Sequence, residues 1–168
     1  IVILSLLCAG VVLSDFQENV AQSKSQKSAL IALKNLPVKG RASKTGYSRK
    51  QFGNAWIDVD RNGCDTRNDV LKRDFVHEVF KVGTRKCKVV GGEWTDPYTG
   101  DTYFFDHQPS AVSIDHVVAL SDAWQKGAQK LNLAQRKNFA NDPLNLIATS
   151  KRVNSQKSDS DAASWLPP

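Results

Sequence analysis

AVSIDHVVAL at residues 111–120, PLNLIAT at residues 143–149 and SKRVNSQKSD at residues 150–159 decide the fold of this 168-residue chain. The first two runs are short and apolar, which predicts two strands. The third run is polar and begins with Ser150, a residue type that commonly caps a helix. The sequence therefore predicts a strand–loop–strand–helix unit in the C-terminal third of the chain.

Polar residues stand at a few positions within these runs. The first strand carries Asp115 and His116, the second carries Asn145, and the helix carries Asn154. Neighbouring side chains in a strand point to opposite faces, so Asp115 and His116 can serve different purposes if the strand ends or bends there. A carboxylate and an amide carbonyl suit a hard divalent ion, and a histidine can deprotonate a water. Asn145 can brace the backbone or ring of His116. Such a set is suited to hydrolysing a phosphodiester.

Taken one at a time, these residues are more often structural. An Asp-His pair in a strand, an Asn at a strand end and a solvated Asn on a helix are all common without any catalytic role. Their joint spacing on a strand–strand–helix pattern is what favours the catalytic interpretation.

The stretches IDHVVAL and NLIATSKRVNSQKSD resemble the ββα-metal motif of HNH endonucleases in a D-H…N…N form. Asn145 and Asn154 lie nine residues apart (154 − 145 = 9), and Lys157 follows three residues later (157 − 154 = 3). A closer similarity is to secreted HNH-family proteins related to the C-terminal domain of GmrSD restriction enzymes. That resemblance runs from about residue 39 to residue 168 and rests on KGRASKTGYSRKQFGNAW, NGCDTRNDVLKRD, EWTDPYTG, DHVVALSDAWQKGA, RKNFANDPLNLIA and WLPP.

The resemblance implies a role for each residue of the set. Asp115 is expected to be a metal ligand and His116 the general base. Asn145 is expected to position His116. Asn154 is expected to be the second metal ligand, at a position where many HNH enzymes have His. The implied cofactor is a divalent metal ion, Mg²⁺ first and Mn²⁺ second.

Contacts to substrate phosphate are expected from basic residues. The resemblance assigns Lys157 to this role, and Arg67 and Arg136 are further candidates, although a solvated helix face explains either arginine equally well. The chain departs from the family pattern at Ala119, where many members have Pro, and at Ser158, where secreted relatives often carry Gly. Neither departure removes a catalytic group.

The N-terminal stretch IVILSLLCAGVVL, residues 1–13, is almost wholly apolar. It matches the hydrophobic region of a secretory signal and is too short to cross a bilayer comfortably. We expect a signal peptide over residues 1–22, truncated at its N-terminus because the chain contains no Met. The expected product is secreted and has no stable membrane association once the signal is removed.

Two cysteines, Cys64 and Cys87, remain after the leader. An isolated pair in an exported protein predicts a disulfide, which would stabilise the fold by about 3 kcal/mol. No zinc site is expected, because the sequence has no C-x-x-C and contains only three histidines.

The charge balance points to an acidic partner. The formal net charge is +6, and residues 24–50 contain eight basic residues and no acidic one. This balance favours nucleic acid or an acidic surface, although a merely solvated, basic secreted protein has the same composition. A hydrophobic fraction of 40% is enough for one ordinary core.

The rest of the chain predicts further short elements. Strands are expected at residues 75–82, 86–90 and 102–105, helices at residues 67–74, 121–126 and 134–140, and turns at Gly91-Gly92 and at DPYTG, residues 96–100. DRNG at residues 60–63 resembles part of a calcium loop, but we do not find the spacing of acids that an EF-hand needs. The expected class is α+β: a ββα-metal (HNH/His-Me finger) nuclease core with an added N-terminal region of mixed strands and helices. We place a basic connector at residues 23–45 and the nuclease domain at residues 46–168, with its core at about residues 111–160.

The leading expectation is a secreted, monomeric, metal-dependent endonuclease acting on DNA and/or RNA. Little sequence specificity is expected, since nothing resembles a base-reading helix or a target-recognition domain. Two alternatives are a nucleic-acid-binding module with a degenerate nuclease site and the nuclease part of a secreted toxin.

Overall fold

The computed structural model describes residues 27–106 and 112–168. The signal peptide predicted for residues 1–22 lies outside the described residues. The chain divides into two compact units, Ile1–Lys39 and Gly40–Pro168. In the first unit, residues 27–34 are helical. None of the helices within the described ranges is long and apolar enough to cross a membrane.

The second unit begins at Gly40, earlier than the predicted boundary at residue 46. The guanidinium of Arg41 donates to the carboxylates of Asp122 and Asp161, at 3.0 and 2.8 Å. These contacts tie the end of the predicted connector to the folded domain, so this segment belongs to the domain.

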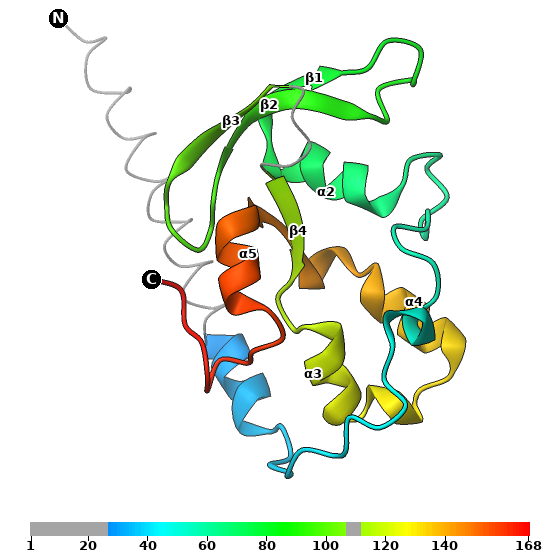
Figure 1. Ribbon diagram of the computed structural model, residues 1–168, viewed down its shortest axis with the longest axis vertical. Helices are drawn as coiled ribbons and strands as arrows, with labels where there is room; N and C mark the ends of the chain where they lie inside the picture. Colours follow the sequence, from blue (N-terminus) through cyan, green and yellow to red (C-terminus); the bar gives the residue numbers. More distant parts are fainter. Residues whose placement is uncertain (1–26, 107–111) are drawn as a thin grey trace, which may run out of the picture. The chain divides into compact units, whose positions relative to one another are not determined.

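Three antiparallel strands form the first sheet, in the order β1-β2-β3 (Figure 1). Their bounds are Val76–Phe80 for β1, Val89–Thr95 for β2 and Thr102–Asp106 for β3. The prediction of a turn at Gly91-Gly92 is wrong, because both glycines lie inside β2. A Cβ at Gly92 would lie 2.9 Å from the ring of Phe75, and the φ of Gly92 is +148°. Glycine is needed here because the strand passes so close to its neighbour, which the sequence alone does not reveal.

Helix α2 (Thr66–Asp74) covers this sheet and closes the larger core. Leu71 from the helix is 2% exposed, and Trp94 from β2 is 1% exposed. The rings of Phe75 and Trp94 stack with centroids 5.0 Å apart. The same core includes Leu146 from the second sheet, so one apolar cluster joins the two sheets.

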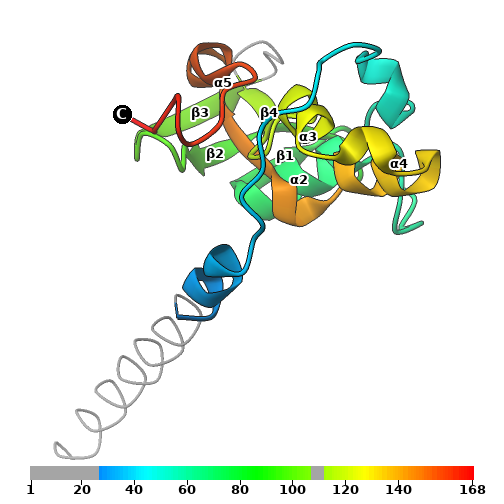
Figure 2. The same cartoon turned by 90° about the horizontal axis from the view of Figure 1, so that it is seen from below.

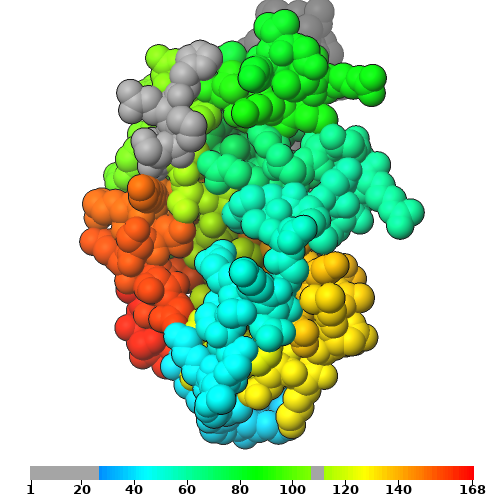
Figure 3. All heavy atoms as spheres, turned by 45° about the vertical axis from the view of Figure 1, so that its right-hand side comes forward, coloured from blue at the N-terminus to red at the C-terminus, as the bar shows by residue number. Residues whose placement is uncertain are grey.

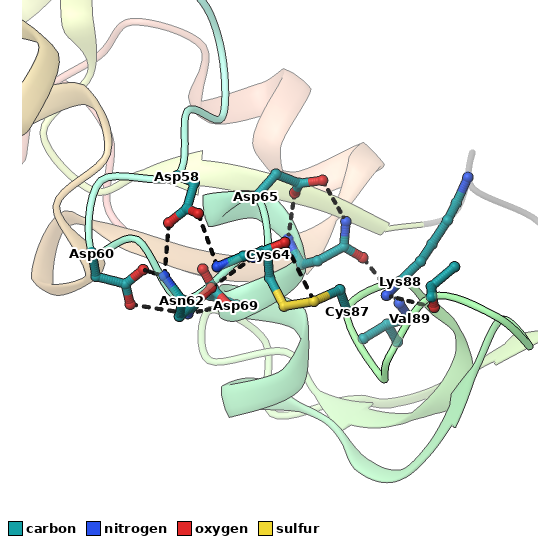
Figure 4. Close-up of a disulfide and its surroundings, with 12 residues drawn as sticks. Asp58, Asp60, Asn62, Cys64, Asp65, Asp69, Cys87, Lys88 and Val89 are labelled. Carbon is teal, nitrogen blue, oxygen red and sulfur yellow. Dashed lines mark hydrogen bonds between the residues drawn. A yellow bond between two sulfur atoms is a disulfide. The ribbon is translucent and has the colours of Figure 1, made fainter.

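The expected disulfide between Cys64 and Cys87 is present (Figure 4). It links the loop before α2 to the turn before β2, across a sequence separation of 23 residues. Closing a loop of this length restricts the unfolded chain and stabilises the fold by about 3 kcal/mol.

An acidic loop lies beside the disulfide (Figure 4). The expectation that these acids lack EF-hand spacing is wrong: Asp58, Asp60, Asn62 and Asp69 stand at positions 1, 3, 5 and 12 of such a loop (58 + 11 = 69). In the structure these acids are held by Asn62. Its side-chain amide donates to Asp60 and Asp69, both at 3.0 Å, and its backbone N–H donates to Asp58 at 3.1 Å.

The predicted strand–loop–strand–helix unit is present. It consists of β4 (Val112–His116), β5 (Leu146–Ser150) and α5 (Lys151–Lys157). The two strands are antiparallel, with Ile114 opposite Ala148. The side chain of Ser150 caps α5 by accepting from the backbone N–H of Val153. Asn145 was expected within the second strand, but it lies in the short 3-10 helix η3 just before β5.

The connection between β4 and β5 is mostly helical. It contains α3 (Leu120–Gln125), η2 (Ala128–Lys130), α4 (Leu133–Ala140) and η3 (Pro143–Asn145). Together with η1 (Arg49–Phe52), α3, η2 and α4 bury a second core around Phe52 and Trp124. Helices α4 and α5 lie on either side of β4 (Figures 1 and 2). The fold is α+β, as expected.

Candidate active site

Asp115 and His116 end β4 and point to different neighbours. The carboxylate of Asp115 meets Lys157 of α5, whereas the ring of His116 meets the backbone of Ala140 at the end of α4. This is the strand alternation expected from the sequence. Because the helices lie on either side of β4, each side chain has its own environment.

The ring of His116 is held by one backbone contact. Its Nε2 lies 2.8 Å from the carbonyl oxygen of Ala140. A carbonyl oxygen can only accept, so Nε2 carries the hydrogen and the neutral ring keeps its lone pair on Nδ1. Burial lowers the pKa of His116, and the nearby charge of Arg49 lowers it further, against the raising effect of the Ala140 contact. The neutral ring is therefore favoured near neutral pH, and its Nδ1 is a base.

Trp56 packs on the same histidine. The two rings are 6.0 Å apart between centroids, with an angle of 20° between their planes. The backbone of Trp56 has a φ of +56°, in the left-handed region that bulky residues rarely adopt. This backbone conformation holds the indole beside His116.

The carboxylate of Asp115 is almost fully enclosed. It accepts from the ammonium of Lys157 at 3.1 Å and from the phenol of Tyr98 at 2.6 Å. Lys157 also donates to the carbonyl oxygen of His116 at 2.9 Å, and its side chain is 4% exposed. The sequence assigned Lys157 to substrate phosphate, but its ammonium is buried against Asp115. The structure gives it an internal ion pair instead.

Sequence reasoning missed Tyr98. This residue comes from the DPYTG turn, whose Asp96 is fully buried and accepts from Thr149 and from the backbone of Ser150. Burial and the neighbouring Asp115 carboxylate raise the pKa of Tyr98, so its hydroxyl remains a donor. Trp165 packs edge-on against the Tyr98 ring, with centroids 5.1 Å apart. The signal was present in EWTDPYTG and WLPP, but nothing in the sequence links those motifs to Asp115.

Asn145 braces the chain just after His116. Its side-chain oxygen accepts from the backbone N–H of Val118 at 2.8 Å, and its side-chain amide donates to the Val118 carbonyl oxygen at 3.2 Å. Its own carbonyl oxygen accepts from the backbone N–H of Val117 at 2.8 Å. Asn145 therefore contacts the backbone that leaves β4, and no hydrogen bond joins it to the His116 ring.

Asn154 lies on the face of α5 that meets β4. Its side-chain amide donates to the hydroxyl of Ser113 at 2.6 Å, which turns the amide and leaves Oδ1 without a hydrogen bond to any described residue. A cavity of about 240 Å³ is lined by Asp115, His116 and Asn154 together. Figure 3 shows the surface hollowed between the cyan segment that contains η1 and the orange segment that contains α5. The fold thus brings three of the expected site residues to one cavity.

The donor set of this cavity fits a hard divalent ion. One carboxylate and one amide oxygen can suffice, because Mg²⁺ keeps several of its waters. Asp115 has lone pairs beyond those used by Lys157 and Tyr98, and the Oδ1 of Asn154 makes no other bond within the described residues. Across the described ranges there is no cluster of three or more His, Cys, Asp or Glu residues that could hold a metal.

The arginines separate into two groups. Arg67 and Arg49 line the cavity, and the guanidinium of Arg67 is 3.4 Å from the Val112 carbonyl oxygen. Arg49, which sequence reasoning missed, is exposed and forms no ion pair with a described residue. Arg136 donates to the backbone carbonyls of Gln51 and Leu131 and lies over the Trp124 ring. Two of the N–H donors of Arg136 are therefore used inside the fold, and the expected contact of Arg136 with phosphate stays a prediction.

Comparison with known proteins places this chain in a family. Residues 65–168 match the family described as "GmrSD restriction endonucleases, C-terminal domain". A protein of Arthroderma benhamiae, described as an "Uncharacterized secreted protein", is 40% identical over 146 residues, which cover 86% of this chain and 68% of that protein. No solved structure matches the chain. The chain belongs to the family of GmrSD restriction endonuclease C-terminal domains, which indicates a nuclease.

Proposed function

We propose that the protein is a metal-dependent endonuclease of the HNH type, which hydrolyses phosphodiester bonds of DNA and/or RNA with little sequence specificity. The observation that carries this proposal is the state of His116. Its Nε2 is held by the Ala140 carbonyl oxygen, which leaves Nδ1 as a base beside the cavity that Asp115 and Asn154 also line.

The four residues that the sequence singled out each have a task in this reaction. The Nδ1 of His116 accepts a proton from the attacking water, whose oxygen then forms the new bond to phosphorus as the bond to the leaving oxygen breaks. Asp115 and the Oδ1 of Asn154 would hold Mg²⁺ or Mn²⁺. When bound, such an ion supplies positive charge to the phosphoryl and leaving oxygens. Asn145 keeps the backbone after His116 fixed, so that the ring stays in place.

Arg49 and Arg67 bind the phosphate in this proposal. Both line the cavity, and guanidinium groups suit phosphate oxygens because they donate in a fixed fork geometry. Contacts of this kind do not depend on base sequence, which agrees with little specificity.

Secretion is supported by three observations. The first 13 residues resemble a secretory signal, the chain contains a disulfide, and a relative is described as a secreted protein. We propose that the protein acts outside the cell as a monomer. The same chemistry would serve as the nuclease part of a secreted toxin.

A nucleic-acid-binding module with a degenerate site is the second candidate. The ion pair between Asp115 and Lys157 favours it, because an ammonium already neutralises the carboxylate that a metal ion would use. The two candidates differ in turnover: the binding module binds in a salt-dependent way but does not cut.

Nicking of supercoiled plasmid, and degradation of RNA, tests the proposal. We expect cleavage with Mg²⁺ or Mn²⁺ and none after chelation. Asp115→Ala is expected to weaken metal binding and cleavage together. A folded protein that binds both nucleic acids but leaves them intact with every divalent metal would instead establish the binding module.

A further inference from the structure

A second cavity borders His116 on the side of α4. Its volume is about 280 Å³, and Phe52, Trp56, Leu120 and Asn141 are among the residues that line it. His116 lines both this cavity and the one that contains Asp115 and Asn154. The proposed hydrolysis uses only the latter, so the cavity beside α4 has no assigned role.

The walls of this cavity suit a flat, apolar surface. Phe52 and Leu120 belong to the second core, and Trp56 is a half-buried indole. Aromatic and apolar side chains of this kind are what proteins place against the faces of unstacked nucleobases. The volume is just below the usual range for small-molecule pockets, which fits a single ring system better than a larger ligand.

One polar group in the wall lacks a partner. Asn141 is 1% exposed, and its side-chain amide donates to the Lys137 carbonyl oxygen at 2.9 Å. Its Oδ1 has no hydrogen bond in the part of the chain that the structure describes. An unsatisfied buried acceptor is unfavourable, so a ligand that brings an N–H donor would remove a cost already present in the free protein.

The rim of the cavity is cationic. Arg49 and Lys50 line it and are both exposed, and Arg49 also lines the cavity that contains Asp115. A ligand that occupies the cavity beside α4 can therefore continue into an anion that Arg49 holds next to His116. A base attached through its sugar to the phosphate being cut has this form.

We propose that the cavity beside α4 binds one nucleobase of the substrate strand, adjacent to the phosphate that is cut. This inference rests on the proposed nuclease function and adds a base-binding subsite to it. All natural bases carry an N–H donor, so a single acceptor at Asn141 accepts any of them and agrees with little sequence specificity. The base must leave a duplex to enter, which favours unpaired strands.

Binding without catalysis tests this subsite. A short thymidine oligonucleotide and an abasic oligonucleotide of equal length carry the same phosphates, and their affinities are compared in excess chelator. We expect the oligonucleotide with bases to bind about 5- to 100-fold more tightly, in line with the effect of one base stacked on an aromatic side chain. Trp56→Ala should remove most of this difference, and Trp56→Phe should keep much of it.

Two further variants isolate the cavity. Phe104→Ala removes an aromatic ring that is 77% exposed and does not line the cavity, so it should leave the difference unchanged. Ala55→Leu enlarges a side chain that lines the cavity and keeps Trp56 in the sequence, and it should reduce the difference even if Trp56→Ala unfolds.

Equal affinity for the two oligonucleotides would overturn the subsite, since phosphate contacts alone would then explain binding. A difference that survives both Trp56→Ala and Ala55→Leu would also overturn it. The nuclease proposal fails separately: a protein that prefers the base-containing strand in chelator but never cuts with metal keeps the subsite and loses the enzyme.

Discussion

The two faces of β4 are built in opposite ways. On the face toward α5, Asp115 is paired with Lys157 and bonded to Tyr98, so its charge is balanced and its position is fixed. On the face toward α4, the ring of His116 has one hydrogen bond to a described residue, through Nε2, and the other ring nitrogen is left as a base. The difference teaches that two adjacent residues of a strand can take different roles because they face different surroundings. Here the contacts fix the carboxylate in place and leave one nitrogen of the imidazole free to act as a base.

The largest effect is expected when the imidazole of His116 is removed. We expect His116→Ala to lower the cleavage rate by about 10²- to 10⁴-fold, because a positioned general base contributes that much. Metal binding should change little, since His116 is not a proposed ligand. Single-turnover cleavage measures the effect. His77→Asn is the matched control, because His77 is exposed on β1 with a φ of +54° that Asn tolerates.

Removing the ammonium of Lys157, on the other face of β4, should lower the stability of the fold. Lys157→Met leaves the buried Asp115 carboxylate without its counter-charge, and we expect the free energy of unfolding to fall by about 3–5 kcal/mol. Urea denaturation measures it. Adding Asp115→Asn should recover part of the loss. If Lys157→Met kept wild-type stability and weakened only nucleic-acid binding, the sequence-based assignment of Lys157 to phosphate would be restored.

The phenol of Tyr98 should contribute less to the free energy of unfolding than the ammonium of Lys157 does. Tyr98→Phe removes a hydrogen bond to a charged group, and we expect a loss of about 1.5–3 kcal/mol in the free energy of unfolding. Tyr103→Phe is the comparison, because the hydroxyl of Tyr103 makes only a long 3.4 Å contact to the exposed Asp101. Similar losses in the two variants would show that Tyr98 has no special part in holding Asp115.

The smallest effect is expected at the end of α5. Ser158 has a φ of +52°, a backbone conformation that glycine adopts readily and that strains other residues. We expect Ser158→Gly to raise the free energy of unfolding by about 1 kcal/mol through relief of this strain. Thermal unfolding measures the gain. A decrease would mean that the hydroxyl of Ser158 contributes more than the backbone strain costs.

The sequence predicts the parts of the site that depend on local pattern. The apolar runs and the Ser150 cap predict β4, β5 and α5, and the spacing of Asp115, His116 and Asn154 then brings these side chains to one cavity. Such patterns are readable because strands and helices repeat at fixed periods.

The remaining contacts depend on distant segments and could not be predicted. Tyr98 reaches Asp115 from a turn in the other sheet, and Lys157 turns inward because that carboxylate lies below it. Glycines stand inside β2 because another part of the chain passes close to them, and the local sequence does not reveal this approach. Arg49 lines the cavity through the fold of its N-terminal segment, not through its spacing from Asp115.

The pH dependence of single-turnover cleavage tests the central claim that a buried, neutral His116 is the base. Burial lowers the pKa of His116 below its ordinary value of 6.5, and a cation bound at Asp115 would lower it further in the same direction. The rate should therefore be constant near neutral pH and fall only as the pH drops through a midpoint below 6.5. A midpoint above that value, or a rate that does not fall in acid, would contradict the account.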